Sequence, residues 1–264
     1  MGTLRKHFVE ITSTNDYAKE LIVDYDKLIV TADYQLAGKG RNDKKWLGDF
    51  GRNVYFTYAI NHKFIKPLKN SSYYQIIGCL AVYETLTDLL GSSIKSSIKD
   101  FLLRIKYPND VYINSVDNNK EDKPSYKKLC GVLSEHSYMG GDLNTTVLGI
   151  GININQKTFD NTLNNNATSL INLGYSIDLE EVINLLTIKL EKLLSLREDI
   201  NFNNWVNLTN LTNKEFQVVN KVGVFRLNKI LEDCRLELIN TDPNSSINNK
   251  IIIDNGDSIR YELL

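Results

Sequence analysis

The apolar positions along the chain follow two spacings, one typical of strands and one typical of helices. Residues 53–60 place Val, Phe, Tyr and Ile at every second position, which predicts a strand. Residues 71–90 carry apolar side chains at helical spacing, and Gly91 is the expected end of that helix. Another helix is expected after Asp178, where Asp-Leu-Glu-Glu has the pattern of a capping box. The same criteria predict a short helix at 16–23, capped by residues 13–15, and strands at 7–11, 27–31, 129–135 and 145–155, with two more inside 101–114.

The pattern changes after about residue 210, where short apolar runs alternate with turn residues. This spacing predicts a small β-barrel, so we expect a larger domain over residues 1–210 and the barrel over residues 211–264. Two polar stretches, 115–125 and 156–166, are expected to be a surface insertion and a mobile loop. The runs assigned to the barrel are 216–219, 222–227, 235–239, 251–253 and 259–263.

Composition and charge narrow the class of protein. Apolar residues make up 42% of the 264 residues, which is enough for a sizeable core. The net charge of −1 gives no general attraction for nucleic acid or for an anionic membrane, so neither is an expected partner. The N-terminus lacks the apolar run of a secretory signal, and no segment approaches the roughly 20 apolar residues of a membrane span. The candidate motifs begin at residue 13, which leaves no room upstream for a helix-turn-helix.

The cysteines and histidines do not suggest a disulfide framework or a zinc site. The three cysteines are far apart and odd in number, which favours a reducing compartment and a cytoplasmic protein. The three histidines lack the spacing of zinc ligands, and the identity of any metal site stays unknown at this point. These residues are Cys79, Cys130, Cys234, His7, His62 and His136.

Two loop segments are candidates for anion binding. In Ala37-Gly38-Lys39-Gly40-Arg41 the glycines allow close approach of the backbone to a ligand, and the two cations can surround phosphate oxygens. In Lys106-Tyr107-Pro108-Asn109-Asp110 the proline stiffens a turn from which an amide and a carboxylate project. Taken alone, either segment fits an ordinary surface turn better than a binding site.

Two predicted strands carry residues that a plain strand does not need. Because side chains alternate along a strand, one of Lys127 and Lys128 is expected to point into a site and the other into solvent. Gly131 would let a ligand lie against the backbone, as would the two glycines of Gly149-Ile150-Gly151-Ile152-Asn153. A bulge is the alternative for the second motif. From the pattern alone, Trp46 fits core packing better than stacking on a purine.

In this order and with these gaps, the motifs resemble those of biotin protein ligases from about residue 8 to about residue 200. Members of that family carry Ser-Thr-Asn near the start of the catalytic domain, a glycine- and arginine-containing loop ending in Trp, a Lys-Trp-Pro-Asn-Asp turn, Lys-x-x-Gly and Gly-x-Gly-x-Asn. The resemblance implies an α+β fold like that of class II aminoacyl-tRNA synthetases and biotin ligases, with a mixed sheet flanked by helices, and a small C-terminal SH3-like β-barrel.

The resemblance also implies a reaction in two steps. Biotin reacts with ATP to give biotinyl-5′-AMP, with Mg²⁺ on the phosphates, and a lysine of a carboxylase biotin-carrier domain then takes the biotin. Preplaced cations would stabilise the charge that builds up on the phosphorus oxygens. On this basis Lys128 is expected to be the main catalytic cation, with Arg41 beside it, and Asp110 orients or deprotonates the acceptor lysine.

The resemblance assigns the remaining site residues to two substrates. Ser13, Thr14, Asn15 and Gln35 match positions that hydrogen-bond biotin, and Gly38, Lys39, Gly40, Arg41, Lys128, Gly131, Gly149 and Gly151 are expected around it. Lys39, Arg41, Trp46, Asn109, Lys128 and Asn153 are expected to bind the nucleotide, with Trp46 stacking on adenine.

This sequence departs from the family pattern at three places. Lys39 replaces the more usual Arg and cannot present a two-pronged donor. Tyr107 replaces the usual Trp, and Asn42-Asp43 replaces a more basic stretch that contains Gly. Two alternatives share the fold or the ligand. A lipoate or octanoate protein ligase is disfavoured because its Arg-Arg-x-x-Gly-Gly-Gly-type segment is missing, and a non-catalytic biotin sensor is disfavoured because the expected cations are present.

Overall fold

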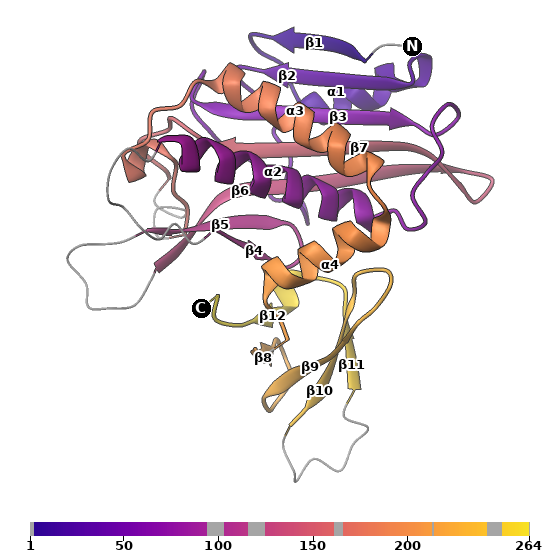
Figure 1. The fold of residues 1–264 in the computed structure, drawn as a ribbon, viewed down its shortest axis with the longest axis vertical. Coiled ribbons are helices and arrows are strands. Elements are labelled where there is room, and N and C mark those ends of the chain that lie inside the picture. Colours follow the sequence, from indigo (N-terminus) through magenta and orange to yellow (C-terminus); the bar gives the residue numbers. More distant parts are fainter. Residues whose placement is uncertain are drawn as a thin grey trace.

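The structure, a computed structural model, describes residues 3–93, 103–115, 125–160, 166–212, 214–241 and 250–263. Within these residues the chain forms a sheet of seven strands and a second sheet of five (Figure 1). The large sheet has the order β1-β2-β3-β7-β6-β5-β4; β1 and β2 are parallel and the other neighbours antiparallel. Its strands are β1 (Leu4–Phe8), β2 (Lys27–Ala32), β3 (Asn53–Asn61), β4 (Leu103–Lys106), β5 (Asp110–Ser115), β6 (Ser125–Met139) and β7 (Asp142–Asn153).

Helices cover both faces of the large sheet. Figure 1 shows α2 and α3 in front of the sheet and α1 behind it. Because side chains alternate between the two faces of a strand, the sheet contributes to a buried core on each face. Phe56 and Tyr58 of β3 are buried on the side of α2 and α3, while Ala59 packs with α1. α4 packs against α2 and β4. The helices are α1 (Thr14–Leu21), α2 (Ser72–Ser93), α3 (Leu179–Ser195) and α4 (Glu198–Thr209), with short 3₁₀ turns η1 (Ile22–Asp24), η2 (Ile171–Leu173) and η3 (Gly256–Ser258).

α1 leaves part of its face of the sheet open. The helix has only 8 residues and begins at an N-cap, Ser13, whose hydroxyl accepts a hydrogen bond from the Asp16 amide at 3.3 Å. Such caps contribute about 1 kcal/mol of helix stability. The cap fixes the residue at which α1 begins. It therefore places Thr14 and Asn15, the first two residues of the helix, at the edge of the uncovered part of the sheet.

One row of cross-strand neighbours makes the uncovered face hollow. Tyr55 of β3 is paired with Gly151 of β7, Gly151 with Gly131 of β6, and Gly131 with Asp110 of β5. Residues in register on neighbouring strands point to the same face. The two adjacent glycines therefore leave a strip of bare backbone between a tyrosine and a carboxylate, as expected where something flat lies against a sheet.

The second sheet lies beyond α4 and contacts the turn between β4 and β5 (Figure 1). It is antiparallel, with the order β11-β10-β9-β8-β12. The Tyr107 amide donates to the Tyr261 hydroxyl at 2.9 Å, and the Tyr107 hydroxyl donates to the Ile253 carbonyl at 3.2 Å. Its strands are β8 (Glu215–Val218), β9 (Phe225–Ile230), β10 (Leu236–Asn240), β11 (Lys250–Ile253) and β12 (Ile259–Arg260).

The structure confirms most of the expected elements and corrects several bounds. The first strand is Leu4–Phe8 and not 7–11, and Gly91 lies inside α2 and does not end it. α4 was not predicted. The strand expected at 129–135 is part of the longer β6, and β7 begins before and ends two residues earlier than the strand expected at 145–155. Most of the 115–125 insertion and part of the 156–166 loop lie outside the described residues. The division into domains after residue 210 stays a prediction. No helix among the described residues has the length and apolar character to cross a membrane.

Candidate active site

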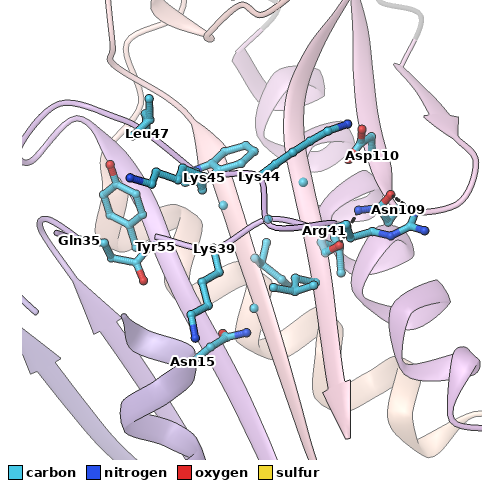
Figure 2. Close-up of a pocket in the computed structure, with 18 of the residues that line it drawn as sticks. Asn15, Gln35, Lys39, Arg41, Lys44, Lys45, Leu47, Tyr55, Asn109 and Asp110 are labelled. Carbon is cyan, nitrogen blue, oxygen red and sulfur yellow. Dashed lines mark hydrogen bonds between the residues drawn. The ribbon is translucent and has the colours of Figure 1, made fainter. Parts of the chain in front are cut away.

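A pocket of about 310 Å³ lies over the bare strip of the large sheet. Its walls come from the start of α1, the loop that follows β2, the β4–β5 turn and the segment after β7. Figure 2 shows the loop that carries Lys39, Lys44 and Lys45 crossing over the strands, with Asn15 near one end of the pocket and Asp110 near the other. The volume lies within the range of small-molecule sites.

Trp46 fills the strip between the glycines. A Cβ atom on Gly151 would lie 2.6 Å from the indole Nε1, and one on Gly131 would lie 2.9 Å from Cζ3. Side chains at either position would therefore displace the ring. The indole Nε1 is buried without a hydrogen-bond partner. From the sequence pattern alone, Trp46 was expected to pack in the core. In the structure it is half-buried and its ring lines the pocket. Its role in stacking on adenine stays a prediction.

Lys128 and Asp110 form an ion pair over the same row. The distance from Lys128 Nζ to Asp110 Oδ1 is 2.8 Å, and the Lys128 ammonium lies 5.6 Å from the centre of the Trp46 ring. The strand register shifts here: Cys130 faces Val111, but Lys128 faces Tyr112, so Leu129 is an extra residue in β6. This bulge lets Leu129 and Cys130 both enter the core while Lys128 stays on the pocket side.

The glycine loop is a small hairpin. The Gly40 amide donates to the Lys44 carbonyl at 2.7 Å, and the Trp46 amide donates to the Gly38 carbonyl at 2.9 Å. Asn42 and Asp43 form its tip with φ angles of 52° and 58°. Asn and Asp are the side-chain-bearing residues that best tolerate this left-handed region. The departure of Asn42-Asp43 from the family pattern therefore preserves a tight turn.

The hairpin is tied to the protein at both ends of the pocket. Lys39 Nζ lies 2.7 Å from Asp16 Oδ1 on α1. Burial opposes ionisation of Asp16, but the hydrogen bond from Lys39 and the charges of Lys39 and Lys19 outweigh it and lower the Asp16 pKa. At the other end, Arg41 donates to Asn109 Oδ1 at 3.1 Å. Polar groups of the protein thus hold Lys39 and Arg41 in place.

One end of the pocket is a polar network. The amide and hydroxyl of Thr14 donate to Gln35 Oε1 at 2.8 and 3.0 Å. The Thr57 hydroxyl lies within hydrogen-bond distance of Thr14 and of Asn15, and Asn15 Nδ2 donates to Glu135 at 2.8 Å. Gly149 makes room for this side chain, because a Cβ there would lie 2.8 Å from Asn15 Nδ2. The network presents amide and hydroxyl groups at fixed positions.

A segment after β7 closes another side. The Lys128 amide donates to the Asn166 carbonyl at 2.8 Å, and the Thr168 amide donates to the Lys128 carbonyl at 3.0 Å. Asn153 is buried and donates to the Thr168 carbonyl at 3.1 Å. Residues 166–168 thus run parallel to β6 beside Lys128, and Ala167 lines the pocket.

The structure brings nearly all the candidate residues of the sequence into this one pocket. Gly38 is the exception. It supports the loop behind the lining, since a Cβ there would meet the Trp46 carbonyl oxygen at 2.5 Å. The chemical roles of these residues stay predictions. Sequence reasoning missed several lining residues: Lys44, Lys45, Leu47, Tyr55, Phe56, Val132, Leu133, Ile150, Phe159, Ala167 and Asp257. Lys44 and Lys45 lie three and four positions after Arg41 in the same loop, so the loop itself was the available signal.

Comparison with known proteins identifies the family. Residues 8–153 match the model of the Biotin/lipoate A/B protein ligase family. This segment is more than half of the chain, and the chain therefore belongs to that family. The resemblance stated from the motifs is confirmed.

Individual relatives agree with this assignment. The bifunctional ligase/repressor BirA of Bacillus subtilis is 28% identical over 187 residues, which are 69% of this chain and 51% of that protein. The biotin--[acetyl-CoA-carboxylase] ligase of Paracoccus denitrificans is 26% identical over 161 residues, 60% of this chain and 58% of that protein. The chain thus spans about half the length of the curated relatives it matches.

A solved structure confirms the expected fold class. The biotin protein ligase from Aquifex aeolicus in complex with biotin and ATP aligns over 98% of this chain and 98% of its own, with a TM-score of 0.69 and 22% identity. The likeness covers the mixed sheet with its helices and also the separate C-terminal antiparallel sheet.

Proposed function

We propose that this chain is an ATP-dependent biotin protein ligase. It joins biotin and ATP to biotinyl-5′-AMP and transfers the biotin to a lysine of the biotin-carrier domain of a carboxylase. The curated relatives named as ligases support this proposal, as does the likeness to a structure that holds biotin and ATP.

The observation that carries the proposal is the division of one pocket into a polar end and a cationic end. The described lining holds five cations, Lys39, Arg41, Lys44, Lys45 and Lys128, against the carboxylates of Asp110 and Asp257. A surplus of positive charge suits a site that must bring together two anions, the biotin carboxylate and the triphosphate.

At the polar end, Ser13, Thr14, Asn15 and Gln35 bind the ureido ring of biotin. A site whose amides and hydroxyls are buried rejects analogues that leave those groups unpaired, by a factor of about 10⁴ or more in favourable cases. Asn15 and Thr14 are 5% and 3% exposed and are held by hydrogen bonds to Gln35 and Glu135, so their polar groups are fixed in place before a ligand binds. A polar wall of this kind suits the ureido ring of biotin better than the aliphatic chain of octanoate or lipoate.

At the cationic end, Lys128 stabilises the activation step. An oxygen of the biotin carboxylate attacks the α-phosphorus, the bond to the bridging oxygen breaks, and pyrophosphate leaves. Lys128 and Arg41 offset the charge on the phosphorus oxygens. The Trp46 ring, which lies over Gly131 and Gly151, stacks on adenine with its other face. Lys39, Gly40, Asn109 and Asn153 complete the nucleotide site. ATP enters with Mg²⁺, which prefers substrate phosphates and one or two carboxylates to a dedicated protein site; no metal-binding group of three or more side chains occurs among the described residues.

In the transfer step the acceptor amine attacks the carbonyl of the mixed anhydride and AMP leaves. Asp110 receives the proton of the amine. Its partner in the free protein is Lys128, which is 2.8 Å away, so anionic substrates that draw Lys128 toward them also release Asp110 for this task. The three described cysteines are free and buried, which suits the cytoplasmic location that we propose.

A transfer assay tests the proposal. The protein is mixed with Mg²⁺-ATP, a carboxylase biotin-carrier domain, and either biotin or octanoate, and the carrier is analysed by mass spectrometry. The expected result is a biotin-sized gain on one lysine that requires ATP. A gain only with octanoate would assign the chain to the lipoate branch of the family, and tight biotin binding without transfer would favour a sensor.

A further inference from the structure

The second sheet reaches into the candidate active site through η3. Asp257 lines the pocket and accepts hydrogen bonds from two residues of the glycine hairpin. Lys44 Nζ lies 2.9 Å from Asp257 Oδ2, and Asn42 Nδ2 lies 2.9 Å from the same oxygen. Next to them, Arg41 donates to Asn255 Oδ1 at 3.3 Å. Three side chains of the loop therefore contact one short segment that is more than 200 residues away in sequence.

η3 is held rigidly against the turn that carries the other site residues. Gly256 has no space for a side chain, because a Cβ there would lie 2.5 Å from the Tyr107 carbonyl oxygen and 2.7 Å from Pro108 Cδ. The Asn255 side chain accepts from the Asp257 amide at 3.0 Å and orders the segment. η3 thus packs against the turn that carries Asn109 and Asp110. Its side chains are therefore hydrogen-bond acceptors at fixed positions for the loop.

We propose that Asp257 is a positioning residue, the acceptor of a latch that fastens the glycine hairpin over bound substrates. The role rests on the proposed function, because closing matters only if the pocket holds biotin and the nucleotide. Asp257 acts through Lys44 and Asn42: it holds the tip of the hairpin, and so keeps Arg41 and Trp46 in the pocket.

The strength of the latch suits a loop that has to open. The side chains of Lys44 and Asp257 are 65% and 52% exposed, and exposed ion pairs contribute little to stability. Substrates can therefore enter without a large barrier from this contact. The hydrogen bond from Lys44 lowers the Asp257 pKa, so the carboxylate keeps its charge at neutral pH. On the other side, the Lys39–Asp16 pair holds the base of the same hairpin.

The latch is tested first without any substrate. The chain has two tryptophans, and Trp205 is 0% exposed, so acrylamide quenching of tryptophan fluorescence reports mainly on Trp46. Reversing the charge in Asp257→Lys should raise the quenching constant, because the loss of an exposed pair shifts the hairpin toward its open form by up to about five-fold. The doubly exchanged variant Lys44→Glu/Asp257→Lys should return most of the way. Glu237→Lys is the matched control, because Glu237 pairs with Lys250 in the same sheet at 3.2 Å and does not touch the loop.

The second measurement uses substrates. Asp257→Lys should raise the KM for ATP and release more biotinyl-5′-AMP into solution, with an unchanged unfolding temperature, and Glu237→Lys should do neither. Equal quenching in Asp257→Lys, Glu237→Lys and the unmodified protein would overturn the latch whatever the activity. A quenching change that the charge exchange restores, in a protein that never transfers biotin, would keep the loop contact but overturn both the proposed function and the role of Asp257 in it.

Discussion

A methyl group at Gly151 would test the floor of the pocket most directly. The ideal Cβ of Gly151→Ala lies 2.6 Å from Trp46 Nε1 and 2.8 Å from Cζ2, whereas carbon and nitrogen atoms in contact prefer about 3.5–4.0 Å. β7 is hydrogen-bonded to a strand on each side and cannot retreat. Trp46 is on a loop, so the indole has to move away by about 1 Å or more.

The structure sets the size of the effect. Overpacking of a tight contact costs about 1–3 kcal/mol, which corresponds to roughly a 5- to 150-fold change in an equilibrium constant. Because the loop yields and the sheet does not, the cost should appear in nucleotide binding and not in folding. We expect the KM for ATP in biotin-dependent ATP–pyrophosphate exchange to rise within that range, with a change in unfolding temperature below about 3 °C.

Two further alanine variants grade the test. Gly131→Ala approaches the same ring less closely, at 2.9 Å from Cζ3, and should have a smaller effect of the same kind. Gly91→Ala meets no atom within 4 Å and should leave the KM unchanged. A normal KM for ATP in Gly151→Ala together with a clear loss of thermal stability would refute the reasoning, because Trp46 would then be part of the core and not of the nucleotide site.

Other predictions concern charge and pH. Lys128→Ala should lower the rate of adenylate formation by about 100-fold or more, the range for removing one charge-stabilising donor, while thermal unfolding changes little; unchanged turnover would exclude Lys128 from the mechanism. Arg41→Gly should release more biotinyl-5′-AMP, measured by chromatography of the free nucleotide, because the loop loses its bonds to Asn109 and Asn255. Burial lowers the pKa of His136 to about 4, below the unfolded value near 6.5, so stability should be complete above pH 6.5 and fall by about 3 kcal/mol as the pH drops toward 4, as measured by urea unfolding; His136→Gln should remove most of that slope and leave the part due to His62, whose pKa burial also lowers.

The sequence predicted the large sheet well where burial is strong. The apolar patterns of β2 and β3 are compatible with few elements other than a buried strand, and both strands lie close to the expected bounds. α4 could not be recognised, because Glu198–Thr209 contains four Asn residues, and Asn is a poor helix former. Its formation depends on burying Trp205, which is a tertiary effect. β1 was placed too late, since its pairing with β2 and not its own pattern sets its register.

The candidate site was predictable where its residues form local motifs. Glycines in strands and cations beside glycines are visible in a single sequence, and these residues meet in one pocket. The bulge at Leu129 was not visible, because strict alternation would place Lys128 and Cys130 on one face. Asp257 was also out of reach. Its bond to Lys44 spans 213 residues, and nothing near either residue signals it.

The pairing of Gly131 with Gly151 makes the length of a distant turn important. β6 runs on for eight residues from Gly131 to Met139, about 26 Å at 3.3 Å each, before the Gly140–Gly141 turn reverses the chain. Adding or deleting one residue there would shift one strand against the other, and a glycine would then lie opposite a side chain. An exposed turn outside the pocket would thus decide whether a flat ring can lie on the sheet, and insertions in that turn should be tolerated less well than substitutions.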